Sequence, residues 1–333
     1  MELKEGKLPL NLLEKYLKIL PLSSDKIKIK PGPGADSSVI EIGDYYLVIT
    51  QDPITFTEKD IGYYAVMVNI NDVLCMGAKP EYFLFTLLLP KGISNEKILK
   101  IFKEVTKVCR KYNISVIGGH TEITPELKRI IISGTMIGLR EKNKGLFPKK
   151  VNKGDYLLCV KEVPIEGISI IVKEKEEELK KIIDEKLLKK FKNYHKKPGI
   201  GIIEEALLLL ENQDVLALHD PTEGGILNGI YEFCEFLNLG VIVYEDKIPV
   251  IKDAESIFKY FGIDPLKTIS SGALLVAVKR EGINGVINLL KSRKIIFSLI
   301  GEFKDPKYGK WMIDKKNNKL KIISFQDEIS KIF

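Results

Sequence analysis

Residues 60–80, DIGYYAVMVNINDVLCMGAKP, place an aspartate on the apolar side of a helix, and this stretch decides much of the fold. Ile61 and other apolar residues recur at helical spacing on the stripe that carries Asp72. The pattern predicts a buried helix over about residues 60–76, ended by Gly77. The helix contains no Lys, Arg or His, and an uncompensated buried carboxylate costs several kcal/mol, so Asp72 needs a partner.

Two kinds of partner suit such a carboxylate. One is a hydrogen bond from the backbone of a neighbouring loop. The other is a hard divalent cation shared with Asp36, which follows the loop PGPG, and with Asp52, which follows the strand-like YYLVIT. Mg²⁺ prefers oxygen ligands and is usually held by a few carboxylates together with substrate phosphates. Asp36, Asp52 and Asp72 are therefore predicted metal ligands, with a structural hydrogen bond as the alternative.

A second candidate site follows the predicted strand ISVIGG at residues 114–119. Paired glycines after a strand, here Gly118 and Gly119, let backbone N–H groups approach an anion closely. His120 comes next. It is either a structural histidine or a group that binds phosphate or transfers a proton.

The stretch ALHDPTEGGI, residues 217–226, is predicted to be a strand-to-helix turn, because an apolar helical stripe follows it. Asp220 or Thr222 would cap that helix. Gly224 and Gly225 would leave free N–H groups at the positive end of the helix dipole, where anions bind. A capped turn with only a structural role is the alternative.

Strands and helices alternate in both halves of the chain, with hairpins among them, which predicts an α/β or α+β protein with mixed sheets. The polar segment 139–155 predicts a domain boundary, giving domains 1–148 and 149–333. Residues 172–197 are rich in Lys and Glu and predict one solvated surface helix.

Composition excludes several classes of protein. The 333 residues are 45% hydrophobic and 29% charged, with a net charge of +7, as in an ordinary globular protein. Lysines alternate with glutamates, which argues against a nucleic-acid surface. The four cysteines are far apart, which favours a reduced, cytoplasmic setting. We expect no membrane span, since no apolar run approaches about 18 residues. The loop GPGADSS lacks the third glycine of a dinucleotide site.

The motifs occur in an order that resembles the PurM-like ATP-binding superfamily, from about residue 28 to 305. This superfamily includes aminoimidazole ribonucleotide (AIR) synthase, the hydrogenase-maturation protein HypE, thiamine-monophosphate kinase and selenophosphate synthetase. The chain looks most similar to HypE and to archaeal HypE-like, AIR-synthase-related proteins. The segments that carry the resemblance are GAD, TQDP, NDVLCMGAKP, GGHTE, HDPTEGG and SGALLVAV.

The resemblance implies an N-terminal α/β domain that binds ATP and pairs its sheet with that of a second copy, forming a dimeric barrel. It also implies a C-terminal α+β domain, with ATP in the cleft and Mg²⁺ on Asp36, Asp52 and Asp72. Asp72 and His120 would be catalytic. The other residues expected to bind the nucleotide are Gly34, Asn71, Gly118, Gly119, Thr121, Asp220, Thr222, Gly224 and Gly225.

The reaction that the resemblance implies is ATP-dependent activation of a carbonyl or amide-type oxygen by phosphorylation. The substrate would be a small molecule or a side chain of a maturation partner protein. Alternatives are a small-molecule kinase, a ring-closing synthetase and a nucleotide-binding accessory protein without turnover. In each of the enzymes, positioning and charge neutralisation would supply most of the catalysis.

Two departures from the family pattern bear on mechanism. His120 stands where the family commonly has an aspartate, which removes one hard ligand and puts the number of Mg²⁺ ions in question. HypE ends in a cysteine that carries the reacting group, whereas this chain ends in SKIF and its last cysteine is Cys234. We therefore expect HypE-like ATP chemistry without a thiol carrier on the chain's own tail.

Overall fold

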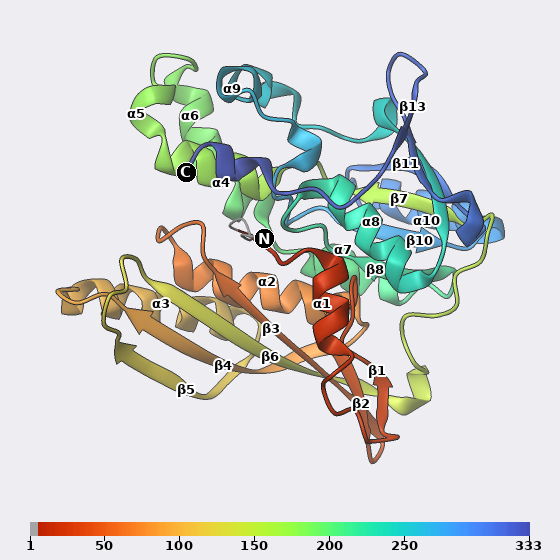
Figure 1. Cartoon of the computed structure of the whole chain (residues 1–333), viewed down its shortest axis with the longest axis horizontal. Helices are drawn as coiled ribbons and strands as arrows, with labels where there is room; N and C mark the ends of the chain where they lie inside the picture. The colour runs from red at the N-terminus through yellow and green to blue at the C-terminus, as the bar shows by residue number, and fades with distance from the viewer. Residues whose placement is uncertain (1–5) are drawn as a thin grey trace. The chain divides into compact units, whose positions relative to one another are not determined.

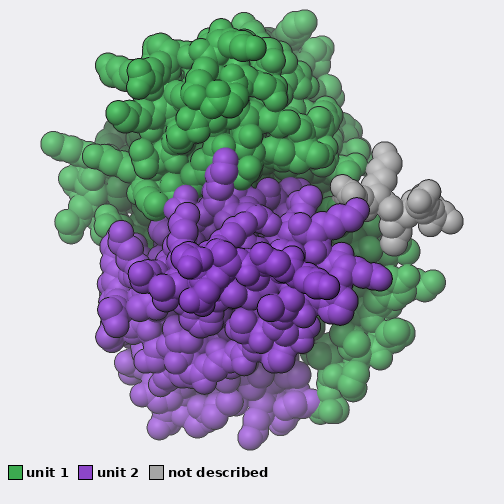
Figure 2. Space-filling view, turned by 90° about the vertical axis from the view of Figure 1, so that its left-hand side faces the viewer, with its two compact units in different colours: residues 1–23, 30–35, 147–333 green, residues 24–29, 36–146 purple. Residues whose placement is uncertain are grey.

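The computed structural model describes residues 6–333, which form two compact units (Figure 2). Unit 1 contains the described residues up to Ser23, then Lys30–Ala35 and Phe147–Phe333. Unit 2 contains Ser24–Ile29 and Asp36–Leu146. Two short N-terminal segments thus belong with the C-terminal half of the chain, an arrangement that a single boundary at residue 148 does not describe.

Unit 2 is built on one mixed sheet, as predicted. In the part of the chain that the structure describes, the strand order is β1-β2-β3-β6-β4-β5, with β4 and β5 parallel and the other pairs antiparallel. Helices α2 and α3 cover one face (Figure 1). The elements are β1 (Ile27–Ile29), β2 (Ser38–Ile42), β3 (Tyr45–Ile54), α2 (Ile61–Cys75), β4 (Lys79–Leu89), α3 (Asn95–Lys111), β5 (Ser115–Ile123) and β6 (Ile131–Glu141).

Helix α2 is the central element of unit 2, and its predicted position is confirmed. It begins at Ile61 and ends at Cys75, and nearly all of its residues are buried, Asp72 among them. Gly77 follows with a positive φ of 75°. A helix that is apolar on every side is stable only when it is surrounded, so α2 needs both the sheet and α3 as cover.

Strand β5 is the exposed edge of this sheet. All nine of its residues are exposed, and β4 pairs with it on one side only. It includes the apolar side chains of Val116, Ile117 and Ile123. A long exposed apolar edge offers unpaired backbone groups to another strand.

Unit 1 also contains a mixed sheet. For the residues described, the strand order is β13-β12-β9-β11-β7-β10-β8, and β9 and β12 are the parallel pair. The strands are β7 (Tyr156–Val160), β8 (Val215–His219), β9 (Gly240–Tyr244), β10 (Leu274–Val278), β11 (Phe297–Lys304), β12 (Lys310–Ile313) and β13 (Lys319–Lys321). The α-helices are α1 (Leu10–Leu17), α4 (Ile165–Glu174), α5 (Glu176–Leu179), α6 (Glu185–Lys192), α7 (Ile203–Leu210), α8 (Gly225–Leu237), α9 (Glu255–Phe261) and α10 (Ile283–Ser292).

The core of unit 1 forms between this sheet and α8. Ile226, Ile230 and Phe233 of α8 are fully buried against sheet residues such as Leu275 and Phe303. The apolar stripe predicted for residues 225–237 is therefore the packed face of this helix. No helix in the described chain is both long enough and apolar enough to cross a membrane.

The prediction of one solvated helix over residues 172–197 is wrong. The segment contains the end of α4, then α5 and α6, and reaches the short π-helical turn η2 (His195–Gly199). Its interruptions let apolar side chains turn inward, and Leu188 and Phe191 of α6 are buried. Asp184 caps α6 by accepting the N–H of Leu187 at 2.7 Å. Most lysines and glutamates occupy the outer faces of these short helices, but Lys173 at the end of α4 is buried.

Replacement of Phe191 by alanine measures how firmly this segment packs. Phe191 is 0% exposed, and its ring meets that of Tyr194 edge to face at 4.9 Å. We expect Phe191→Ala to lower the free energy of unfolding by about 3–5 kcal/mol in chemical denaturation. Lys186→Ala, on the exposed face of the same helix, should change it by less than about 0.5 kcal/mol. Equal effects of the two substitutions would contradict a packed α6.

Candidate functional site

The first group of predicted site residues meets around Thr50 of β3. The Thr50 Oγ1 atom lies 2.7 Å from Asp72 Oδ2 and 3.0 Å from the carbonyl oxygen of Asp36. Asp72 is 5% exposed, whereas Asp36 is half-buried. The hydroxyl of Thr50 therefore solvates the carboxylate that the sequence places on the apolar helix.

Asp52 joins the same group through the geometry of β3 and α2. It lies two residues after Thr50, on the same face of the strand. Its N–H donates to Asn69 Oδ1 at 3.0 Å, and Asn69 Nδ2 donates to the Asp52 carbonyl oxygen at 3.3 Å. Asn69 and Asp72 are three residues apart on one stripe of α2. These hydrogen bonds reach the carboxylate of Asp72 but only the backbones of Asp36 and Asp52, and a metal ion shared by the three carboxylates stays a prediction.

The glycine pair differs from its predicted form. Strand β5 does not end at Gly119 but continues to Ile123, so the glycines lie inside a strand rather than in an anion-binding loop. A side chain at Gly119 would place its Cβ 2.0 Å from the carbonyl oxygen of Phe85, so glycine allows β4 and β5 to pair. Close strand pairing is the local reason for this glycine.

His120 is exposed on β5, and its Nε2 lies 2.9 Å from Glu122 Oε2. This contact lowers the pKa of the Glu122 carboxyl, and a hydrogen bond from Thr124 lowers it further. Strands β6 and β4 lie between β3 and β5. Three strand spacings separate the backbones by roughly 14 Å. Strand pairing within one chain therefore does not bring His120 or Thr121 to the aspartates.

The DPTEGG turn connects β8 to α8 in unit 1, as predicted, but its capping differs. Gly224 is the N-cap residue of α8, and no side chain caps the helix there, so the predicted cap by Asp220 or Thr222 is wrong. The expected free N–H groups are also absent from this turn. Gly225 N–H donates to the Thr222 carbonyl oxygen at 3.0 Å, and Gly224 N–H donates to Asp327 Oδ2 at 2.6 Å.

Two distant segments of unit 1 hold this turn, and sequence reasoning found neither. Asp327 also accepts the N–H of Ile329 at 2.8 Å and so begins the short helix η8 (Glu328–Lys331). From the other end of the chain, the N–H of Lys7 donates to Glu223 Oε1 at 2.9 Å, and Lys7 Nζ lies 3.2 Å from Thr222 Oγ1. The only local sequence pattern that indicates a role for Asp327 is DEIS, an aspartate just before a short helix that it could cap.

Gly34 packs against the helix that follows the turn. Its φ is +74°, and an added Cβ would lie 2.0 Å from the carbonyl oxygen of Glu232 in α8. No other residue fits without moving one of the two segments. The glycine-containing segment 30–35 and the DPTEGG turn are therefore neighbours through α8, within unit 1.

His219, the histidine of the turn motif, is a core residue. It is 3% exposed, and its ring stacks on Phe233 with centroids 5.4 Å apart at 14°. Its Nε2 lies 3.9 Å from Glu232 Oε2. Asp220, the next residue, is also buried, at 2% exposed. The turn thus begins inside the core and emerges only at Thr222 and Glu223.

Three of the four cysteines carry thiols that stay protonated near neutral pH. All four are buried. Burial raises the pKa of the Cys109 thiol to about 11 and those of Cys159 and Cys234 to about 12. Since the thiolate is the nucleophile, these groups are inert near neutral pH.

The chain has the two-domain PurM-like fold. Each domain contains a mixed sheet covered by helices; the three aspartates belong to unit 2 and the DPTEGG turn to unit 1. The model of the AIR synthase related protein N-terminal domain matches residues 34–140, and that of its C-terminal domain matches residues 152–313. The chain therefore belongs to the AIR synthase related family, and its relatives include HypE-like proteins.

The relatives include maturation proteins and a kinase. A putative hydrogenase expression/formation protein of Methanocaldococcus jannaschii is 30% identical over 265 residues, covering 78% of this chain and 76% of that protein. Thiamine-monophosphate kinase of Pyrococcus horikoshii is 24% identical over 303 residues, which cover 86% of this chain and 87% of the kinase. The solved structure of the hydrogenase maturation protein HypE in complex with ATP superimposes with a TM-score of 0.67 at 18% identity. The superposition covers 99% of this chain and 98% of the HypE chain. The predicted family and fold are confirmed.

Asp327 gives the turn a pH dependence that can be measured. Burial raises the pKa of its carboxyl to about 7, and the charge of Glu223 adds to this, although the N–H groups of Ile329 and Gly224 lower it. The folded pKa exceeds the ordinary value of 3.8, so folding favours the protonated form. The contribution of this group to stability is therefore full below pH 4 and is lost as the pH rises through 7.

We expect Asp327→Asn to remove this dependence. In thermal unfolding between pH 5 and pH 8, the Tm of the wild type should fall relative to that of the variant, because only the wild type carries the buried titrating group. Asp305→Asn is the matched control, since Asp305 is an exposed aspartate that begins the short helix η7 (Pro306–Tyr308). A constant difference in Tm between the wild type and Asp327→Asn would contradict the assignment.

Proposed function

We propose that this protein is an ATP- and Mg²⁺-dependent, HypE-like enzyme that activates a carbonyl or amide-type oxygen by phosphorylation. The observation that carries the proposal is the buried Asp72 carboxylate bonded to Thr50, whose hydroxyl also contacts the backbone of Asp36 and whose strand carries Asp52. Carboxylates on neighbouring segments repel one another, and a bound cation would offset that repulsion. Family membership and the ATP complex of a relative support the choice of ATP.

The donor set in unit 2 fits a hard cation. Asp36, Asp52 and Asp72 offer carboxylate oxygens, and Thr50 orients one oxygen of Asp72. Oxygen ligands without sulfur or imidazole suit Mg²⁺. When bound, the ion would neutralise the charge of the nucleotide phosphates. The further residues proposed for the nucleotide are Gly34, Asn71, Asp220 and Thr222, because Gly118, Gly119 and Thr121 lie on the distant strand β5 and the N–H groups of Gly224 and Gly225 are occupied.

The substrate of this proposed enzyme must come from outside the chain. A carrier thiol would need an accessible cysteine, and all four cysteines are buried. The reacting oxygen therefore belongs to a free small molecule or to a partner protein of the maturation type. His120, paired with Glu122 on an exposed strand, is proposed to transfer a proton.

A small-molecule kinase is the second candidate. The kinase relative from Pyrococcus horikoshii matches a larger share of this chain, 86%, than the maturation relative does, 78%. The products distinguish the two reactions, because a kinase leaves phosphate on the substrate, whereas dehydration or ring closure releases inorganic phosphate. Phosphorus NMR of the reaction mixture, with candidate amides and phosphorylatable alcohols, separates them.

Asp72→Asn tests the metal and nucleotide assignment. Removing one carboxylate should weaken Mg²⁺-dependent ATP binding by at least about 10–100-fold in calorimetry, and should abolish substrate-dependent ATP hydrolysis. Asp44→Asn is the matched control, because Asp44 is an exposed aspartate at the β2–β3 turn of the same unit. If wild-type protein at high concentration binds neither ATP nor ADP with Mg²⁺, the proposal fails.

We further propose a homodimer that forms through β5. Its nine exposed residues, with Val116, Ile117 and Ile123 among them, make an uncovered sheet edge of a kind that monomers normally protect. A second copy of the same edge is the simplest cover, and it agrees with the sheet pairing expected from the family.

A charge on the edge should prevent this association. We expect light scattering to give twice the chain mass of 37.7 kDa for the wild type, and a mostly monomeric Ile117→Lys variant. Ile117 is 53% exposed, and Ile296 in unit 1 is 55% exposed, so Ile296→Lys is a matched control that should remain dimeric. A monomeric wild type, or an undisturbed Ile117→Lys dimer, would exclude β5 as the interface.

A further inference from the structure

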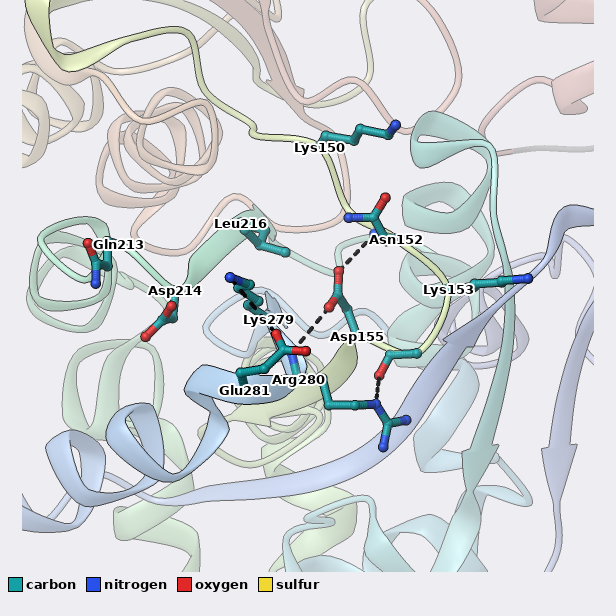
Figure 3. A pocket seen from close by; sticks show the side chains of 11 residues that line it. Lys150, Asn152, Lys153, Asp155, Gln213, Asp214, Leu216, Lys279, Arg280 and Glu281 are labelled. Atoms are coloured by element: carbon teal, nitrogen blue, oxygen red, sulfur yellow. Dashed lines mark hydrogen bonds and ion pairs between the residues drawn. The ribbon is translucent and has the colours of Figure 1, made fainter.

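A polar cavity of about 620 Å³ lies at one end of the unit 1 sheet. Three connections line it: residues 150–155 before β7, residues 213–216 at the start of β8 and residues 279–281 after β10 (Figure 3). The DPTEGG turn follows the other end of β8. A five-residue strand separates its two ends by about 13 Å, so the cavity is a separate place in the fold.

Hydrogen bonds between the three connections fix the walls of this cavity. The buried carboxylate of Asp155 accepts the N–H of Asn152 at 2.8 Å and the N–H of Arg280 at 3.1 Å, and Figure 3 shows it between them. The N–H of Lys279 donates to the carbonyl oxygen of Asp214 at 2.9 Å. A preformed cavity of this size is in the range that small molecules fill.

The acidic groups of the cavity are compensated within its walls. Asp155 is held by the two N–H groups. Asp214 packs against Gly282, the N-cap of α10, where an added Cβ would lie 2.1 Å from the Asp214 Cγ atom. A carboxylate at a helix N-terminus is stabilised by the helix dipole. Glu281 lies 3.9 Å from Lys279 Nζ.

The basic groups are compensated only in part. Arg280 pairs with Glu302 at 2.9 Å and donates through Nε to the Gly154 carbonyl oxygen at 2.7 Å. Lys150 and Lys153 are exposed at the rim, and within residues 6–333 neither makes a hydrogen bond or an ion pair. Their long side chains can fold over a bound group. The lining holds four basic and three acidic side chains, and Lys150 and Lys153 are the two basic groups to which the described residues supply no ion pair.

We propose that this cavity binds a small phosphorylated molecule, with Lys150 and Lys153 on its phosphate groups. The amides of Asn152 and Gln213 supply further polar contacts, and Leu216 is the one apolar side chain among the lining residues. The polar lining suits a polar ligand, and the two lysines at the rim suit its phosphate groups through charge-assisted hydrogen bonds. The site is independent of the proposed ATP chemistry.

The test uses inorganic pyrophosphate as the probe, in calorimetry without divalent metal, so that the proposed Mg²⁺-dependent nucleotide site does not compete for the probe. The full-length wild type should bind pyrophosphate, and the double variant Lys150→Gln/Lys153→Gln should bind it at least about tenfold more weakly. Added salt should weaken binding to the wild type. Inorganic phosphate and ribose 5-phosphate, titrated in turn, distinguish a free anion from a phosphate ester as the preferred ligand.

Lys186→Gln/Lys189→Gln is the matched control, since these two lysines of α6 are also exposed and also three residues apart. It should bind pyrophosphate as the wild type does. No pyrophosphate binding by the wild type, or equal weakening in both double variants, would overturn the proposal. Asp72→Asn separates this site from the proposed function, because it should lose ATP binding and keep pyrophosphate binding.

Discussion

The hydrogen bond between Thr50 and Asp72 lets a carboxylate lie inside unit 2, and much of the structure depends on it. Helix α2 is buried nearly throughout and carries no basic residue, so the partner of Asp72 has to come from another element. β3 supplies it at 2.7 Å. The same hydroxyl reaches the backbone at Asp36, and the strand period puts Asp52 on the same face. The contact that permits a buried carboxylate thus also joins β3 to the segment that carries Asp36.

The sequence predicted those parts of the fold in which one apolar stripe dominates. Helices α2 and α8 lie where their stripes indicated, because each buries a continuous face. The prediction of one helix for residues 172–197 was wrong because charged side chains outnumber buried ones such as Leu188 and Phe191. This excess of charge hides the apolar pattern of several short packed helices. Strand β9 was not predicted. Its five residues, GVIVY, are too short and too uniformly apolar to show a period.

For the site, the sequence predicted a buried Asp72 that needs a partner, but not how the DPTEGG turn is held. The group that accepts the Gly224 N–H is 103 residues away along the chain, and no local pattern indicates such a pair. The prediction of an anion-binding loop at Gly119 was wrong for a different reason. A glycine pair suits a close contact between strands as well as it suits such a loop. The residue type determines which backbone conformations are possible, and the tertiary contacts determine which of these conformations is adopted.

The division of the chain into units has a consequence for how the protein is made. Residues 36–146 of unit 2 are continuous and are synthesised well before the end of unit 1, so this unit can collapse around α2 while the ribosome is still translating. Unit 1 must wait, because the carboxylate that holds its central turn is at position 327. During that interval the β5 edge is already exposed, so a nascent chain offers its strand to neighbours on the same messenger RNA before its own fold is complete.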